Sequence, residues 1–148
     1  MAALDLSPGK YGDPAGSPDL RAALAHWAIR SRGVAVAAEQ IFVTAGAGHA
    51  VDLVARVLLE PGEVVAVEEP GYPVVVALLR SHGLQVVGIP VDDEGIVVDA
   101  LPARAKLVYV TPSHQFPLGM VMSRRRRYAL LDWATANGAA VIEDDYDS

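Results

Sequence analysis

The chain has 148 residues, of which 52% are hydrophobic and 20% charged, so it is long and apolar enough for one domain with a buried core. Its formal net charge of -6 argues against non-specific nucleic-acid binding by this segment, and the lack of cysteine excludes disulfides and thiolate metal sites. The first residues show no signal peptide, and no apolar run approaches the roughly 18 residues of a membrane-spanning helix. These totals favour a cytoplasmic globular domain without a membrane partner.

The first third of the chain is predicted to hold an arm, two helices and a strand. Residues 1–16 are rich in turn formers and are expected to form an N-terminal arm, and residues 17–148 are expected to form the domain. A helix is predicted to start with Ser17 as its cap and to stop at Gly33. Residues 40–44 are expected to form a strand, and residues 45–48 form a small-residue turn that leads into a helix ending before Pro61.

The rest of the chain alternates between strands and helices. Strands are predicted at 63–67, 85–89, 106–111 and 139–142, and helices at 74–82 and between Ser123 and Gly138. Residues 90–95 are expected to form a polar turn, and 96–101 fit no single class. This alternation predicts an α/β fold in which helices cover both faces of a mainly parallel sheet, a three-layer α/β/α arrangement.

Four loops are predicted to share one edge of the sheet, because ligand sites in such folds lie at the carboxyl ends of the strands. The first loop places a small-residue turn at a helix N-terminus, where backbone N–H groups suit a phosphate, although the pattern matches neither a Walker loop nor GxGxxG. Its residues are Gly46, Ala47 and Gly48. The other three loops contribute Tyr72, then His114 and Gln115, and finally Asp144 and Tyr146.

Taken together, these side chains suit a phosphorylated pyridine ring. An ionised Asp144 beside the ring nitrogen keeps that nitrogen protonated, Tyr72 offers a face for stacking, and Tyr146 can hydrogen-bond a phenolic oxygen. Each feature also has an ordinary structural explanation: a tight turn, a packed tyrosine, a structural histidine, an acidic loop after a strand. Both explanations remain open at this point.

A run of four arginines, Arg124–Arg127, follows Ser123. Four residues cover about one helical turn, so their charges point in all directions, and a helix start is an unfavourable place for cations. We interpret the run as a solvated or structural feature, and not as a nucleic-acid-binding surface.

Several stretches carry a resemblance to a known family: Tyr11–Gly16, Leu20–Arg21, Glu69–Pro73, Thr111–Pro117 and Glu143–Ser148. They resemble the aminotransferase-like domain of the MocR subgroup of GntR-type bacterial transcription regulators, and more broadly the fold-type-I pyridoxal-phosphate aminotransferases of class I/II. The resemblance implies part of the large domain of that fold, pyridoxal 5'-phosphate as cofactor, an amino acid or amine as ligand, and a homodimer in the intact family.

The resemblance also implies roles for the residues above. The turn Gly46-Ala47-Gly48 would hold the phosphate, Tyr72 would stack on the ring, and Asp144 would pair with the ring nitrogen. His114 and Gln115 would contact the oxygen side of the ring, and Tyr146 would approach the phenolic oxygen. Relatives often carry a hydroxyl or amide in the phosphate turn, and a threonine or serine where Leu118 stands, so this chain departs from the family pattern there.

The family's Schiff-base lysine lies downstream of the Glu-Asp-Asp-Tyr string, and we expect this chain to lack it. Its two lysines are Lys10, in the predicted arm, and Lys106, at the start of a strand. Three hypotheses follow: a pyridoxal-phosphate-binding aminotransferase-like domain acting on an amino acid or amine, a ligand-sensing effector module of a regulator without turnover, or a non-functional fragment. An arm carrying Tyr11 would reach a partner's site in the intact family, whose DNA-binding winged helix this segment lacks.

Overall fold

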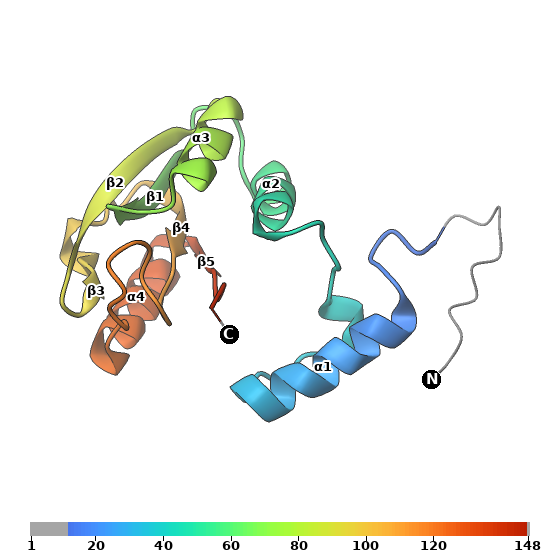
Figure 1. The fold of residues 1–148 in the computed structure, drawn as a ribbon. Helices are drawn as coiled ribbons and strands as arrows, with labels where there is room; N and C mark the ends of the chain where they lie inside the picture. Colours follow the sequence, from blue (N-terminus) through green and yellow to red (C-terminus); the bar gives the residue numbers. More distant parts are fainter. Residues whose placement is uncertain (1–11, 148) are drawn as a thin grey trace. The chain divides into compact units, whose positions relative to one another are not determined.

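A computed structural model of the chain, shown in Figure 1, describes residues 12–147. It divides into two compact units, Met1–Ala45 and Gly46–Ser148. The predicted boundary between an arm at 1–16 and a domain at 17–148 stays a prediction. Lys10 and Tyr11 lie outside the described residues.

The first unit is built on helix α1 (Pro18–Arg32). The helix begins and ends where the sequence predicts, and Gly33 closes it in the left-handed region at a φ of 67°. Ser17 is the N-cap residue, as predicted, although its side chain makes no capping hydrogen bond. Arg21 holds the unit together, because its guanidinium donates to Asp13 at 3.0 Å and to the carbonyl of Ala38 at 3.0 Å.

Residues 40–44 do not form the predicted strand. A 3-10 helix, η1 (Ala38–Gln40), takes up the start of this stretch. The N–H of Val43 then donates to the carbonyl of Ala15 at 2.9 Å, a single contact with a loop. A strand requires a neighbouring strand to accept its hydrogen bonds, and within residues 12–147 this stretch has none. The apolar Phe42 is therefore 66% exposed.

The second unit contains a five-stranded sheet with the order β3-β2-β1-β4-β5. Its strands are β1 (Val64–Glu69), β2 (Gln85–Asp92), β3 (Gly95–Ile96), β4 (Ala105–Val110) and β5 (Ala140–Glu143). All neighbours are parallel except β2 and β3, which form an antiparallel hairpin. The helices are α2 (Ala47–Leu58), α3 (Pro73–Ser81), the 3-10 helix η2 (Val98–Ala100) and α4 (Arg124–Asn137).

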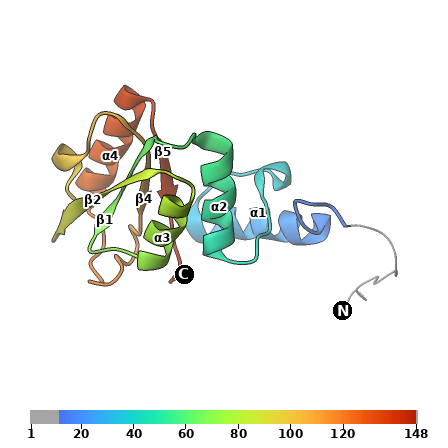
Figure 2. The same ribbon diagram turned by 90° about the horizontal axis from the view of Figure 1, so that it is seen from above.

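Two hydrophobic clusters, one on each face of the sheet, produce three layers. Figure 2 shows α4 on one side of the strands and α3 on the other. Val65 and Val67 of β1 pack with Leu79 of α3, whereas Val64 and Ala66 belong to the cluster that contains α4. Both faces of β1 are therefore buried, as its continuous apolar run predicts. The predicted α/β class with a mainly parallel, doubly covered sheet is confirmed.

The expected turn at 90–95 is shorter than predicted, because β2 continues through Pro90 to Asp92. Proline offers no N–H, but the carbonyl of Pro90 accepts a hydrogen bond from Val97 at 2.9 Å, so the pairing of β2 with the following chain continues.

Helix α2 begins with Ala47, which lies within the small-residue turn predicted at 45–48. No helix in the described part of the chain is long and apolar enough to cross a membrane.

Helix α4 begins and ends as predicted, and its arginines have structural partners. The hydroxyl of Ser123 accepts from the N–H of Arg126 at 3.1 Å, and Gly138 ends the helix at a φ of 62°. The guanidinium of Arg126 donates to Asp92 at 2.8 Å and to the carbonyl of Ile96, which fastens the helix to the β2–β3 hairpin. Arg125 pairs with Glu94, and Arg127 donates to the carbonyl of Pro112 at 2.9 Å. These contacts give three of the arginines a structural role.

Candidate functional site

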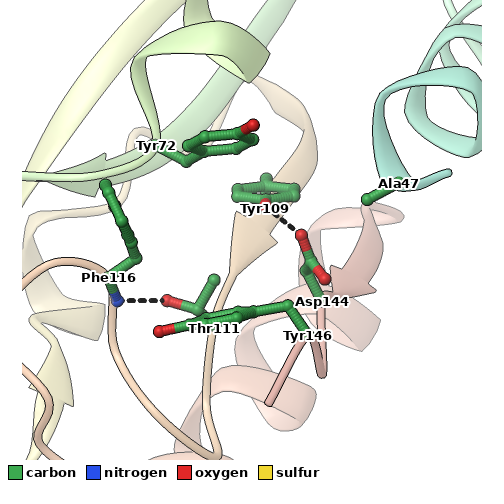
Figure 3. Close-up of a pocket in the computed structure, with 7 residues that line it drawn as sticks. All are labelled: Ala47, Tyr72, Tyr109, Thr111, Phe116, Asp144 and Tyr146. Atoms are coloured by element: carbon green, nitrogen blue, oxygen red, sulfur yellow. Dashed lines mark hydrogen bonds between the residues drawn. The ribbon is translucent and has the colours of Figure 1, made fainter.

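A cavity of about 230 Å³ lies at the carboxyl ends of β1, β4 and β5, within the second unit (Figure 3). It is lined by Ala47, Tyr72, Tyr109, Thr111, Phe116, Asp144 and Tyr146. The chain runs from β1 outward to β2 and later returns to place β4 on the other side of β1, so this edge contains a point where the strand order reverses. Such points are the usual ligand sites of open α/β sheets. This volume is below the roughly 300–1,000 Å³ of most pockets for drug-sized ligands, so the cavity suits only a small group.

Three aromatic rings form one wall of the cavity. Tyr72 lies immediately before α3, and the ring of Phe116 meets it edge-on, with 5.5 Å between centroids and 72° between planes. Phe116 also lies edge-on to Tyr146, at 6.4 Å and 78°. Edge-to-face contacts of this kind favour fixed ring positions, so the wall has a defined shape.

Asp144, which follows β5, contributes a carboxylate to the cavity (Figure 3). Its N–H donates to the carbonyl of Val110 at 2.9 Å, which continues the pairing of β5 with β4. Its Oδ2 accepts a hydrogen bond of 2.5 Å from the hydroxyl of Tyr109. Burial, and then the bond to Asp144, raise the pKa of Tyr109, so its phenol keeps its proton and remains a donor. Partial desolvation also raises the pKa of Tyr146, and nearby carboxylates raise it by a smaller amount.

The small-residue turn reaches the cavity through Ala47, the first residue of α2. Gly46 precedes it at a φ of 113°, a conformation that an L side chain rarely adopts. Gly48 follows it in the first turn of α2, and a methyl group added there would meet no atom within 4 Å. Ala47 and Gly48 lie in the first turn of α2, and the N-terminus of a helix suits an anion.

Four of the predicted residues do not line the cavity: Gly46, Gly48, His114 and Gln115. The side chain of His114 is half exposed, with its Nδ1 3.3 Å from Oδ2 of Asp147 and its ring 6.1 Å from that of Tyr146. Gln115 is buried, and its amide nitrogen donates to Glu68 at 3.3 Å and to the carbonyl of Pro70 at 2.9 Å. The predicted contacts of these four residues with a cofactor stay predictions, whereas Ala47, Tyr72, Asp144 and Tyr146 do meet around one cavity.

Sequence reasoning missed Tyr109, Thr111 and Phe116, which also line the cavity. The rule about the carboxyl ends of strands could have found Tyr109 and Thr111, since they lie at the end of β4 and just after it. Sequence reasoning also missed Glu68, which directly follows the predicted strand at 63–67. Glu68 is in fact part of β1 and only 2% exposed.

No lysine of the described residues lies at this cavity. Lys106 is the only one between residues 12 and 147, and it is exposed near the start of β4. The cavity is at the other end of that strand, about 13 Å away at the usual rise per residue. Among the described residues, no group of three histidine, aspartate or glutamate side chains could hold a metal ion.

A mainly parallel sheet with helices on both faces and a cavity at its carboxyl edge defines the chain as an α/β domain. The aminotransferase class I and II family matches residues 7–146, and the chain belongs to that family. The resemblance that the motifs predict is confirmed.

The relatives of the chain include both regulators and enzymes. The chain is 42% identical over 129 residues to the HTH-type pyridoxine biosynthesis transcriptional regulator PdxR of Corynebacterium glutamicum. It is 40% identical over 134 residues to the probable rhizopine catabolism regulatory protein MocR of Rhizobium meliloti. These alignments cover 87% and 90% of this chain but only 28% and 27% of the two regulators.

A solved structure shows the same arrangement of elements. Kynurenine aminotransferase from Pyrococcus horikoshii, in complex with PMP, matches with a TM-score of 0.82 and 34% identity. The match covers 91% of this chain and 36% of that enzyme. The described sheet therefore corresponds to part of a fold-type-I aminotransferase structure.

Proposed function

We propose that this chain is the pyridoxal-phosphate-binding part of a ligand-sensing effector module, of the kind found in aminotransferase-like transcription regulators. The observation that supports it is the meeting of Ala47, Tyr72, Asp144 and Tyr146, from separate segments, around one cavity. Similarity to regulators such as PdxR and MocR favours sensing over turnover.

The residues around the cavity fit this cofactor by their chemistry. The carboxylate of Asp144 suits a protonated pyridine nitrogen, the ring of Tyr72 suits a pyridine face, and the hydroxyl of Tyr146 suits a phenolic oxygen. The start of α2 at Ala47 suits the phosphate. When bound, pyridoxal phosphate supplies an aldehyde that reacts with amines and a ring that accepts electrons.

The chain's own side chains would prepare the site for such a ligand. The hydroxyl of Tyr109 orients the carboxylate of Asp144 by donating to one of its oxygens, which leaves the other for the ligand. The edge-on rings of Tyr72, Phe116 and Tyr146 keep water from one side of the cavity. An amino acid or amine is the proposed second ligand, in a homodimer located in the cytoplasm, and DNA would be bound by a segment outside this chain.

Amino-group transfer to or from an amino acid or amine is the second candidate function. The family match and the likeness to kynurenine aminotransferase favour it. It requires a lysine at the cavity, and the only lysine of the described residues, Lys106, lies at the opposite end of β4. We place sensing first because the identity to the two regulators, 42% and 40%, is higher than the 34% identity to kynurenine aminotransferase.

Titration with pyridoxal phosphate, followed by protein fluorescence and cofactor absorbance, tests the proposal. The variant Asp144→Ala should weaken binding by about tenfold or more, since a hydrogen bond to a charged group contributes about 1.5–3 kcal/mol. Asp132→Ala removes an exposed carboxylate from α4 and serves as the control. Absence of saturable binding would reject the proposal and favour a non-functional fragment, and equal affinities of Asp144→Ala and the unmodified chain would reject the assigned role of Asp144.

A further inference from the structure

Glu68 is a buried carboxyl group with a specific set of donors. It lies in β1 and is 2% exposed. Its Oε2 accepts from the N–H of Thr111 at 3.2 Å, from the hydroxyl of Thr111 at 2.6 Å and from the amide of Gln115 at 3.3 Å. Its Oε1 has no hydrogen-bond partner. Burying a carboxyl group without a cation costs free energy unless hydrogen bonds compensate, and here Thr111 and Gln115, which follow β4, supply these hydrogen bonds.

The hydrogen bonds continue from Glu68 to the wall of the cavity. The hydroxyl of Thr111 accepts from the N–H of Phe116 at 3.0 Å, as Figure 3 shows. The amide of Gln115 also donates to the carbonyl of Pro70 at 2.9 Å, in the loop after β1 that carries Tyr72. One carboxyl group thus connects the two loops whose rings meet in the cavity.

The loop after β1 folds back tightly over the same residue. A methyl group added at Gly71 would lie 2.3 Å from the carbonyl oxygen of Glu68, so only glycine fits without a shift of the backbone. Gly71 is the immediate neighbour of Tyr72. The backbone next to Tyr72 is therefore held close to the backbone of Glu68.

We propose that Glu68 is a positioning residue that fixes Phe116 and Tyr72 relative to each other and so gives the cavity its shape. It acts through Thr111 and Gln115 and need not touch the ligand. Where it concerns cofactor affinity, the inference rests on the proposed function. All three hydrogen bonds are accepted by Oε2, and Oε1 accepts none. The single oxygen of a neutral glutamine amide can therefore accept the same three hydrogen bonds.

Three variants separate this role from a general effect on folding. Glu68→Leu keeps the approximate size of the side chain but removes the acceptor, whereas Glu68→Gln keeps an oxygen for the same three donors. Glu69→Leu changes the exposed neighbour and is the control. Two readouts apply to each variant: hydrogen exchange of the Thr111 and Phe116 amides without ligand, and affinity for pyridoxal phosphate.

Glu68→Leu should speed exchange at both amides and weaken pyridoxal phosphate binding, each by about tenfold or more, because the hydrogen bonds to Glu68 are lost. Glu68→Gln should restore both values to within about threefold of the unmodified chain, since its oxygen accepts the same donors. Unchanged exchange in Glu68→Leu would overturn the proposal. Faster exchange with unchanged affinity would also overturn it, because the network would then be structural only.

Failure of the proposed function is distinguishable from failure of this inference. If the unmodified chain does not bind pyridoxal phosphate, the proposed function fails. The positioning role of Glu68 is then tested by NMR, through the contact between the rings of Tyr72 and Phe116. Loss of that contact in Glu68→Leu with retention in Glu68→Gln supports the inference, and retention in both overturns it. If Glu68→Leu does not fold, Thr111→Val replaces it, because that variant removes only the hydroxyl that connects Glu68 to Phe116.

Discussion

The hydroxyl of Tyr109 donates a hydrogen bond of 2.5 Å to the carboxylate of Asp144, although 35 positions separate the two residues in the sequence. The register of the parallel strands explains the contact, because Tyr109 of β4 lies opposite Ile142 of β5. Asp144 follows Ile142 by two positions and therefore points to the same face of the sheet. The pairing of β4 with β5 thus brings a phenol and a carboxylate together at the cavity.

Removing this hydroxyl should weaken the binding of pyridoxal phosphate. In Tyr109→Phe, Asp144 loses a donor that orients its carboxylate, and a hydrogen bond to a charged group contributes about 1.5–3 kcal/mol, so we expect an affinity lower by about tenfold. Tyr128→Phe removes a hydroxyl from a tyrosine that is 63% exposed on α4 and serves as the control. Fluorescence titration measures both, and equal affinity of Tyr109→Phe and the unmodified chain would contradict the prediction.

Pyridoxal phosphate should bind without a stable covalent link to one lysine of this chain. Lys106 lies at the far end of β4 from the cavity, and Lys10 lies outside the described residues. Borohydride reduction followed by mass spectrometry should therefore show no stoichiometric adduct at either residue. A single clean adduct on Lys10 or Lys106 would show that the chain does supply the lysine.

Transamination by the chain should be negligible for the same reason. A positioned general base alone contributes about 10²–10⁴-fold to a rate, and the covalent route through lysine would also be missing. The formation of keto acids from a panel of amino acids measures this activity. Robust turnover by the purified chain would favour the enzymatic candidate function over sensing.

The raised pKa of Glu68 should make the stability of the folded chain depend on pH. Burial raises the pKa of its carboxyl above the ordinary value of 4.5, so the folded state favours the protonated form. The folded state therefore binds more protons than the unfolded state above that value, and the free energy of unfolding falls as the pH rises through this window. Glu68→Gln does not lose stability in this way, so its stability relative to the unmodified chain should increase as the pH rises above 4.5. Urea unfolding across this range measures the difference, and parallel profiles would contradict the prediction.

The open edge of β5 should promote self-association of the isolated chain. Among residues 12–147, β5 pairs with β4 alone, and its residues Val141 and Ile142 are apolar and only partly buried. An unpaired edge whose residues 140–142 carry no charge can add a strand from a second molecule. Ile142→Lys should shift the chain toward monomer in size-exclusion chromatography, since a lysine on an edge strand opposes such pairing. A sharp monomer peak with cooperative unfolding for the unmodified chain would show that this edge is not a liability.

Local signals in the sequence determined most of the secondary structure. Gly33 and Gly138 adopt the left-handed conformation that ends a helix, and Ser123 caps α4 with its hydroxyl. These features depend on neighbours within a few positions, so the sequence alone predicts them. The alternation of apolar strands and helices likewise predicts the parallel sheet, and its carboxyl edge predicts a cavity that includes Tyr72 and Asp144.

Tertiary structure decided the features that depend on partners distant in the sequence. Residues 40–44 have the composition of a strand but lack a neighbouring strand in the described part of the chain, so they form none. Gln115 has a side chain that could contact a ligand, but its amide donates hydrogen bonds to Glu68 and Pro70, more than 40 positions earlier in the sequence. Hydrogen bonds between distant residues follow from strand register and loop packing, which no local pattern encodes. The hydrogen bonds of Glu68 and the Tyr109–Asp144 bond therefore depend on how the tertiary structure places the strands side by side.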